Sequence, residues 1–453
     1  MPLDFDAVIV GAGPTGCVIA RDLARAGWRV ALCDASPRDR LGRQVIIEVE
    51  NDAFVRAGVA VPCGAEVPYH GRTARILVGS GREAFAVPGG VPATALYLDR
   101  FVRKLAGLAE EAGAQVLGGY SASGPILRGG AVVGAAFDTQ EGAVELRCRI
   151  VVDATGFKAA LLHALDPDLG LSIDDDPRDD VVAATRLHRT DPALAEQAVR
   201  EGRQADEEIW ATVGRLGSYS TEFRHLSLRN QRAYVLVGVK AAQAPEIPGV
   251  LRDHVARIGG VGAPLHAGGG QIRVRSARHR LVGDGFLLAG ESARMVIPMN
   301  GSGVASGLTA AALASRVMDE ALRADDVSTR ALWPYAARWQ RGRGARLAAM
   351  DRVRIGYEGL PPGASDSLFD GFGGPEDAVA ANAGELPPLR PATLLRRAWG
   401  LLRYPRLIPA MARIGAGAST VLVHHRGFPE RWDPERFAAW SQRSTRLLAY
   451  PAR

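Results

Sequence analysis

The first 34 residues follow a pattern that few folds other than a dinucleotide-binding unit accommodate. A short run rich in β-branched residues, residues 6–10, is followed at once by the sequence Gly-Ala-Gly-Pro-Thr-Gly over residues 11–16. Apolar residues then recur at helical spacing up to Gly27, and a second apolar run ends at Asp34. The pattern predicts a strand, a glycine turn, a helix, a second strand and a terminal acid.

The glycine turn indicates how a ligand would bind. Glycines allow a pyrophosphate to approach the backbone N–H groups at the start of a helix, where the helix dipole favours negative charge. An acid at the end of the second strand can accept a hydrogen bond from a ribose hydroxyl. We therefore predict an adenine dinucleotide site; the alternative is a glycine turn with a purely structural role. The residues of the predicted site are Gly11, Gly13, Pro14, Thr15, Gly16, Asp34 and Ala35.

A second glycine segment lies far down the chain. Residues 281–307 have the pattern of a strand, a loop and a helix of small residues. No charged residue lies between Arg294 and Arg316, a length that would allow a membrane span. Pro298, Asn300 and several hydroxyl residues argue against a span, and glycines at the start of the helix predict a second ligand contact.

Together the two segments resemble those of the flavoprotein superfamily that contains para-hydroxybenzoate hydroxylase and geranylgeranyl reductase. The resemblance implies FAD as the cofactor. It places an acid on the ribitol and turns the second helix N-terminus toward the pyrimidine end of the flavin ring. Glu291 stands where the family has the shorter aspartate. The cofactor-binding residues implied in this segment are Gly290, Glu291, Pro298, Gly301, Ser302, Gly303 and Val304.

Three shorter stretches resemble the same family. The pair Gly42-Arg43 resembles a Gly-Arg pair that reaches toward the phosphate region of the cofactor. Residues 97–105 resemble a helix start that would bring Arg100 to the cofactor from the other side. Residues 149–156 resemble the strand that returns to the dinucleotide domain, in which Asp153 either ties a loop or contacts FAD. The likeness covers residues 1 to about 345.

The predicted fold class is α/β with an additional antiparallel sheet. Residues 1–165 and 276–325 are expected to form a discontinuous Rossmann-like FAD-binding domain of the para-hydroxybenzoate hydroxylase type. Alternating runs within residues 166–275 predict an inserted antiparallel sheet with one face turned to the substrate. Residues 326–453 are expected to be helical, apart from residues 356–390, whose Gly, Pro and Asp content predicts a long surface excursion.

The chain also departs from its relatives. Thr155-Gly156 stands where aromatic hydroxylases have Asp-Gly. The loss of that aspartate disfavours a standard NAD(P)H-dependent hydroxylase. Residues 45–48, Val-Ile-Ile-Glu, replace a Cys-Gly of geranylgeranyl reductases. Residues 219–224 keep the Tyr and the Phe of the reductases' Tyr-x-Trp-x-Phe-Pro motif and lack its Trp and Pro. The chain contains no Trp-x-Trp-x-Ile-Pro motif, which disfavours a flavin halogenase.

Polar residues near the predicted sheet are the candidates for substrate contact, and the alternative is that they are solvated strand residues. Reduction of a double bond needs a proton donor near the substrate, and Tyr219 or Glu222 would act as that donor. Glu48 joins them because the family places its loop over the flavin. The candidate catalytic residues are therefore Tyr219, Glu222 and Glu48, with Arg224 and His225 as further substrate contacts.

The predicted function is that of a soluble FAD-dependent oxidoreductase. The expected substrate is bulky and apolar, of an isoprenoid, polyene or polyketide kind, and the reaction is hydride transfer to or from a carbon–carbon bond. NAD(P)H is a candidate electron donor. The alternatives are a single-component flavin monooxygenase, a redox-neutral enzyme resembling lycopene cyclase, and a non-catalytic lipid-binding escort resembling the Rab GDP-dissociation inhibitors.

Cysteine and charge content limit compartment and partners. Four separated cysteines without a Cys-x-x-Cys motif predict neither a disulfide framework nor a metal site, and favour a reducing, cytoplasmic compartment. From residue 386 onward the chain carries 12 arginines against three acidic residues. This basic segment predicts contact with an anionic membrane or an acidic carrier protein, or else a lid whose arginines face water. It lacks the interleaved aromatics of a nucleic-acid site.

Overall fold

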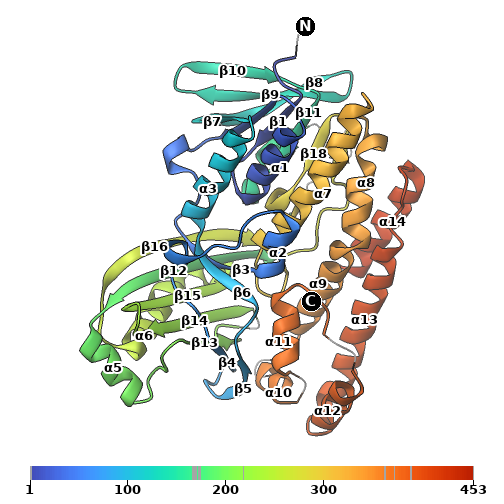
Figure 1. Cartoon of the computed structure of the whole chain (residues 1–453). Coiled ribbons are helices and arrows are strands. Elements are labelled where there is room, and N and C mark those ends of the chain that lie inside the picture. The colour runs from blue at the N-terminus through green and yellow to red at the C-terminus, as the bar shows by residue number, and fades with distance from the viewer. Residues whose placement is uncertain are drawn as a thin grey trace.

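The computed structural model describes residues 3–165, 171, 175–217, 219–361, 364–371, 373–387 and 390–451 (Figure 1). The first sheet and its helices lie at the top of Figure 1, a large antiparallel sheet lies at the lower left, and the C-terminal helices run along the right side. A two-stranded sheet formed by β3 (Ile46–Glu50) and β6 (Ala93–Tyr97) lies between the first sheet and the antiparallel sheet.

The first sheet carries the dinucleotide-binding pattern. Its strand order is β17-β18-β11-β1-β2-β7, and its pairs are parallel except for β17 with β18. Every residue of β1 is buried, as expected for a strand covered on both faces. The strands are β1 (Ala7–Val10), β2 (Val30–Asp34), β7 (Gln115–Gly118), β11 (Ile150–Asp153), β17 (Val282–Gly283) and β18 (Phe286–Leu288).

Helices with one apolar face cover this sheet. A small antiparallel sheet of β8 (Ser121–Arg128), β9 (Ala131–Thr139) and β10 (Gly142–Arg147) adjoins it. Helix α1 packs against both α3 and α7, so the two glycine segments start helices that are neighbours. The helices of this part are α1 (Pro14–Arg25), α2 (Asn51–Arg56), α3 (Leu98–Glu111), α4 (Ala160–His163) and α7 (Val304–Arg323).

The large sheet has the strand order β16-β12-β15-β14-β13-β4-β5 and is antiparallel except for β13 with β4. Helices α5 (Pro192–Arg200) and α6 (Ile247–Ile258) pack on it. The strands are β4 (Thr73–Leu77), β5 (Glu83–Pro88), β12 (Asp180–Thr190), β13 (Glu208–Val213), β14 (Ser220–Ser227), β15 (Arg232–Lys240) and β16 (Val261–Arg273).

The two faces of the large sheet have different neighbours. Val235 and Val237 pack with residues of α6, whereas Tyr234 and Leu236 pack with Ile46 of β3. Because side chains alternate between faces along a strand, this assigns a face to every paired residue. We call the two faces the α6 face and the β3 face.

Strands β4 and β5 lie within residues 1–165, yet they belong to the large sheet. The domain division therefore differs here from the one expected from the sequence. The strands reach the sheet because β4 pairs in parallel with β13, which lies more than a hundred residues later in the chain. Such a long-range pairing leaves no local signal in the sequence.

The C-terminal helices cover the right side of Figure 1. Two of them, α10 and α11, fall in residues 356–390, which were expected to form a surface excursion. They pack on the large sheet instead, and the rings of Phe369 and Phe85 lie 6.4 Å apart. The helices are α8 (Thr329–Arg341), α9 (Arg343–Glu358), α10 (Ala364–Gly371), α11 (Pro375–Asn382), α12 (Pro391–Leu402), α13 (Ile408–Arg426) and α14 (Pro434–Leu447).

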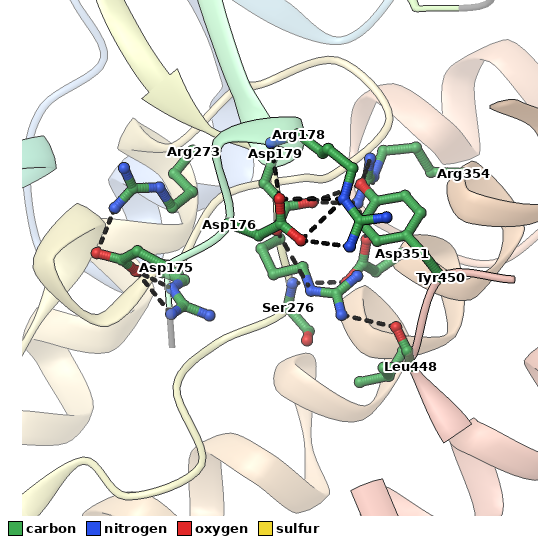
Figure 2. A network of polar contacts seen from close by, with 12 residues as sticks. Asp175, Asp176, Arg178, Asp179, Arg273, Ser276, Asp351, Arg354, Leu448 and Tyr450 are labelled. Atoms are coloured by element: carbon green, nitrogen blue, oxygen red, sulfur yellow. Dashed lines mark hydrogen bonds and ion pairs between the residues drawn. The ribbon is translucent and has the colours of Figure 1, made fainter. Parts of the chain in front are cut away.

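A buried network of charges joins the C-terminal part to the large sheet (Figure 2). Nη2 of Arg354 lies 2.7 Å from Asp351 and 3.0 Å from Asp179. The Tyr450 hydroxyl donates to Asp179 at 2.6 Å. Desolvation of Asp175 opposes ionisation, but three neighbouring arginines outweigh it and lower its pKa to about 2. Helix α9, Tyr450 and the start of β12 are therefore fixed to one another.

Candidate active site

The two glycine segments meet at Thr15. A methyl group added at Gly290 would lie 2.7 Å from Oγ1 of Thr15, and one added at Gly307 would overlap with the same oxygen. Only glycine leaves room for this contact at both positions. Two segments nearly 300 residues apart in the chain therefore form the two sides of one site.

Each glycine of the first turn has its own surroundings. Gly11 has a φ of +106°, and a side chain there would overlap with the carbonyl oxygen of Ala154. A side chain at Gly16 would overlap with the carbonyl oxygen of Gly11. Gly13 is different, because a methyl group there would meet nothing within 4 Å. The open space at Gly13 adjoins the N-terminus of α1, where a pyrophosphate can accept hydrogen bonds from the first amide groups.

Asp34 lies at the end of β2, beside this turn, and is followed by Ala35. Its Oδ2 accepts a hydrogen bond from the Ala12 amide at 2.8 Å, and its Oδ1 accepts one from the Ser36 amide at 2.8 Å. The carboxylate is thereby fixed next to the glycine turn. Each oxygen retains capacity for a further hydrogen bond, which a ribose hydroxyl can donate.

Glu291 carries a carboxyl oxygen, Oε1, that is buried and has no hydrogen-bond partner among the described residues. Burial raises the pKa of Glu291 to about 7, although Arg43 and Arg273 oppose the rise. An unpaired buried oxygen is costly, and a hydroxyl-bearing ligand would relieve that cost. The residues at this position therefore fit the ribitol of FAD, despite the side chain being longer than the family's aspartate.

Replacement of Glu291 by Gln tests this pKa through the stability of the FAD-free protein. The folded state keeps the Glu291 proton up to about pH 7, whereas the unfolded chain releases it near the ordinary value of 4.5. The contribution of Glu291 to the free energy of unfolding should therefore be largest below pH 4.5 and fall as the pH rises to 7, by on the order of 3 kcal/mol. Urea unfolding of Glu291→Gln across this window should lack that fall. An identical fall in the variant would contradict the assignment.

Arg43 lies between the FAD-binding part and the large sheet. A methyl group at Gly156 would lie 3.8 Å from its Nη2 and 3.6 Å from Oε2 of Glu291. A methyl group at Gly270, in β16, would lie 2.8 Å from its Nη1. At the neighbouring Gly268, a side chain would overlap with the backbone of Gln44. The structure thus brings Arg43 and Glu291 to the same place.

Arg100 is held by local contacts at the start of α3. Its guanidinium lies 4.2 Å from the centre of the Tyr97 ring, and Nη1 donates to the carbonyl oxygen of Ala65 at 3.1 Å. No contact recorded for the described residues joins it to either glycine segment. Its approach to the cofactor remains a prediction.

The loop before α7 is braced by Asn300. Its Oδ1 accepts a hydrogen bond from the Ser302 amide at 2.9 Å, and its Nδ2 donates to Asn382 of α11 at 3.4 Å. Gly301 has a φ of +74° and Pro298 is buried. Helix α7 then begins at Val304, after Gly303, and none of the described side chains caps it, so its first amide groups are free to donate to a ligand. Its positive end can stabilise an anion at the pyrimidine edge of a flavin.

Tyr219 is the candidate catalytic residue with the closest approach to this loop. The side chain is 8% exposed, and its hydroxyl has no hydrogen-bond partner among the described residues. A methyl group at Gly301 would lie 3.6 Å from that hydroxyl oxygen. The ring lies against Val181, Ile272 and Val274. Burial raises the pKa of Tyr219 well above its ordinary value, so the phenol keeps its proton.

Glu48 faces a cluster of aromatic side chains on the β3 face of the large sheet. It accepts a hydrogen bond from the Tyr69 hydroxyl at 2.9 Å. The Tyr69 ring stacks on His225 at 4.5 Å and on Tyr234 at 5.0 Å. Burial raises the pKa of Glu48, although the hydrogen bond from Tyr69 opposes the rise. Glu48 and His225 are therefore on the same face of the sheet.

Glu222 lies on the opposite, α6 face, so its expected place beside the substrate has to be corrected. Its Oε2 lies 2.7 Å from Nε2 of His254 in α6 and 2.7 Å from Nη2 of Arg215. Arg224 faces the same way and donates to Gln204. Alternation along β14 separates Glu222 from His225, and the sequence alone does not tell which face meets a ligand.

Removal of the Glu222 carboxylate should therefore affect stability and leave the cofactor in place. Glu222→Ala would leave His254 and Arg215 without their buried partner, at a cost of about 3–5 kcal/mol. Chemical denaturation would measure this loss. The absorbance spectrum of bound flavin should be unchanged below the transition. A variant as stable as the parent but without turnover would instead place Glu222 in the reaction.

Asp153 was expected either to hold a loop in place or to contact FAD, and the structure shows that it holds the loop. It is fully buried, and Oδ1 accepts hydrogen bonds from the amide and hydroxyl of Thr155 and from the hydroxyl of Ser292. Oδ2 accepts hydrogen bonds from the amides of Leu161 and Leu162. These bonds connect the end of β11 to the segment of Glu291. Asp153 thus supports the site through its neighbours.

Comparison with known proteins agrees with this geometry. Residues 6–42 match a family model described as FAD dependent oxidoreductase. A digeranylgeranylglycerophospholipid reductase of Methanopyrus kandleri is 28% identical over 356 residues, which cover 75% of this chain and 83% of that protein. A protein of the same name from Sulfolobus acidocaldarius is 23% identical over 365 residues, which cover 78% of this chain and 77% of that protein.

Solved structures share the fold. A geranylgeranyl bacteriochlorophyll reductase-like protein from Thermoplasma acidophilum has a TM-score of 0.71 at 19% identity, covering 90% of this chain and 99% of that one. A flavin-dependent brominase has a TM-score of 0.60 at 15% identity, covering 89% and 99%. A probable FAD-dependent monooxygenase from Pseudomonas aeruginosa has a TM-score of 0.57 at 18% identity, covering 78% and 97%. The predicted fold class is confirmed.

The cofactor and the class of enzyme now follow. Glycine segments around residues 13 and 303 close on Thr15, Glu291 offers an unpaired oxygen between them, and the sequence relatives match over most of this chain. FAD is the cofactor that these residues fit. The chain is an FAD-dependent oxidoreductase that is similar over most of its length to digeranylgeranylglycerophospholipid reductases and shares the fold of a geranylgeranyl bacteriochlorophyll reductase-like protein.

Proposed function

We propose that this enzyme reduces carbon–carbon double bonds in a bulky apolar substrate of the isoprenoid type, with NAD(P)H as the electron donor. The observation that carries the proposal is the match over 75% of the chain to proteins named digeranylgeranylglycerophospholipid reductase. The reductase-like solved structure also has a higher TM-score than the brominase or the monooxygenase.

The surface offered to the substrate supports an apolar ligand. Ile272, Phe223 and Leu236 lie on the β3 face of the large sheet and remain partly exposed. Ile272 also lies beside Gly301, because a methyl group there would be 3.5 Å from its Cδ1. Burial of a hydrocarbon chain against such side chains is favourable by about 25 cal/mol per Å² of apolar surface. This face can therefore bind an isoprenoid next to the flavin loop.

Two side chains at this face, Tyr219 and Glu48, can hold the proton that the reduction needs. When bound and reduced by NAD(P)H, the flavin would supply the hydride for one carbon of the double bond. The Tyr219 hydroxyl, beside Gly301, holds a proton for the other carbon. Glu48 is a second proton holder, since burial favours its neutral form and Tyr69 orients its carboxyl group. Each proton given to product is replaced from solvent.

A single-turnover experiment tests the reaction. The FAD-bound protein, reduced with dithionite in the absence of oxygen, is mixed with a geranylgeranyl lipid in detergent. Loss of reduced flavin should depend on the lipid, and the lipid should gain two hydrogen atoms per double bond reduced. Repetition in air with NAD(P)H distinguishes the alternatives: oxygen uptake that requires the lipid, with an oxygen atom in the product, would establish a monooxygenase and contradict the proposal.

A further inference from the structure

Helix α12 turns an apolar face outward. Leu395, Trp399 and Leu402 are exposed by 72%, 69% and 66%, and Leu394 by 46%. Their spacing of three and four residues places them on one side of the helix. A surface helix of a water-soluble domain normally hides such a side against the core. Here the side forms a continuous exposed strip, which we call the α12 strip.

The polar side of α12 is the side that faces the protein. Arg397 is 6% exposed and pairs with Asp377 of α11. Thr393 donates to Glu376, also of α11, at 2.9 Å. The helix is therefore fixed with its polar residues inward, and rotation of α12 to bury the α12 strip would break these contacts. The strip is a built feature of the surface.

The chain on both sides of the α12 strip is rich in arginine. Seven arginines and no acidic residue lie between Glu385 and Glu430. Arg390, Arg403 and Arg406 flank the strip, and all three are exposed. Apolar side chains flanked by exposed arginines match the two layers of an anionic bilayer surface, which are acyl chains below and phosphate groups above.

The next helix extends this surface. Residues Pro405–Arg426 form the one helix among the described residues with the length and composition to cross a membrane, and most of it is exposed. One side of it is fixed to the protein, because Val421 packs with Ala348 of α9 and His425 contacts Ser444 of α14 at 3.0 Å. Arg413 interrupts its exposed side. This attachment favours a helix that lies along the surface over one that spans.

We propose that the α12 strip, with the exposed side of α13, docks this enzyme on the surface of an anionic phospholipid bilayer. Leu395, Trp399 and Leu402 enter the boundary between headgroups and acyl chains, and the surrounding arginines bind lipid phosphates. The proposal concerns attachment and does not depend on the reaction that the enzyme performs. A second copy of the chain or an acidic carrier protein would be a different occupant of the same strip.

Vesicle flotation of the full-length FAD-bound protein tests the docking. The protein should float with vesicles of phosphatidylcholine and phosphatidylglycerol, bind vesicles of phosphatidylcholine alone more weakly, and leave the anionic vesicles when salt is added. Retention after extraction with concentrated salt and alkaline carbonate would indicate a spanning helix and overturn the proposal. Absence of flotation with anionic vesicles would overturn it as well.

Matched variants locate the contact. Leu395→Ser with Trp399→Ser should weaken binding to anionic vesicles by at least about tenfold, without change in the melting temperature or the flavin spectrum. Val55→Ser removes an equally exposed residue, 74% exposed in α2, and should have no effect. Arg403→Gln with Arg406→Gln should cost about fivefold per arginine on anionic vesicles only.

Two results would contradict the assignment of the α12 strip. One is binding to anionic vesicles that survives the Leu395 and Trp399 substitutions. The other is a wild-type dimer, seen by sedimentation velocity, that the same substitutions convert to a monomer in the absence of vesicle binding. Turnover of a detergent-dispersed lipid should be the same in the variant and the parent, which separates failure of docking from failure of the proposed reaction.

Discussion

Replacement of Gly13 by alanine is expected to leave the fold intact and to weaken FAD binding by roughly 10- to 100-fold. The backbone at Gly13 has a φ of −72°, which alanine adopts without strain, and the added methyl group would meet no protein atom within 4 Å. The methyl group would instead occupy the space that a pyrophosphate needs at the start of α1. Thermal melting of the FAD-free protein and titration with FAD measure the two effects separately.

Two other glycines frame this result. Gly16→Ala would overlap with the carbonyl oxygen of Gly11, so both the stability and the FAD affinity should fall. Gly107→Ala lies in the interior of α3 with nothing within 4 Å, so stability should rise by about 0.5–1 kcal/mol and FAD affinity should not change. FAD affinity at the wild-type level in Gly13→Ala would show that the first glycine segment does not hold the cofactor.

Tyr219→Phe is expected to lower turnover by roughly 10²- to 10⁴-fold and to raise stability. The large kinetic effect follows if the hydroxyl delivers the proton in the reduction. The gain in stability, about 1–3 kcal/mol, follows because the hydroxyl is buried without a hydrogen-bond partner among the described residues. A rise in stability with a loss of activity distinguishes a reacting group from a packing residue. Stopped-flow reoxidation of the reduced flavin and chemical denaturation measure the two quantities.

Tyr335 provides the matched control. Its ring is also fully buried, but its hydroxyl donates to the carbonyl oxygen of Leu288 at 3.0 Å. Tyr335→Phe should therefore lose about 1 kcal/mol of stability and retain turnover. If Tyr219→Phe turned over lipid as fast as the parent, proton delivery would pass to Glu48, and Glu48→Gln would become the slow variant.

The cofactor half of the site is readable from the sequence because its constraints are local. A glycine turn between a strand and a helix, and an acid at the end of the next strand, specify where a phosphate and a ribose bind. The second segment is recognisable for the same reason, as glycines at a helix start. That the two segments meet is a tertiary fact, carried by contacts of Thr15 with Gly290 and Gly307.

The substrate half is less readable, because other elements pack on each face of the large sheet and the sequence does not tell which face meets a ligand. Glu222 and Glu48 are both acids in strands, and only the register of β14 with β15 places Glu222 beneath α6. Asn300 braces its loop through Asn382, which lies far away in the chain. Tyr69 orients Glu48 from a separate loop. No sequence pattern marks such residues, and they were not predicted.

The glycines of β16 have a mechanical consequence. At Gly268 the backbone of Gln44 crosses the strand so closely that a side chain there would collide with it, and a methyl group at Gly270 would lie 2.8 Å from the Arg43 guanidinium. At Gly268 the main chain of the sheet thus lies directly against the main chain at Gln44, with no side chain in between. We therefore expect the FAD-binding part and the large sheet to behave as one rigid frame throughout a catalytic cycle. A lipid substrate would then have to enter along the surface of the two bodies, because they do not separate to admit it.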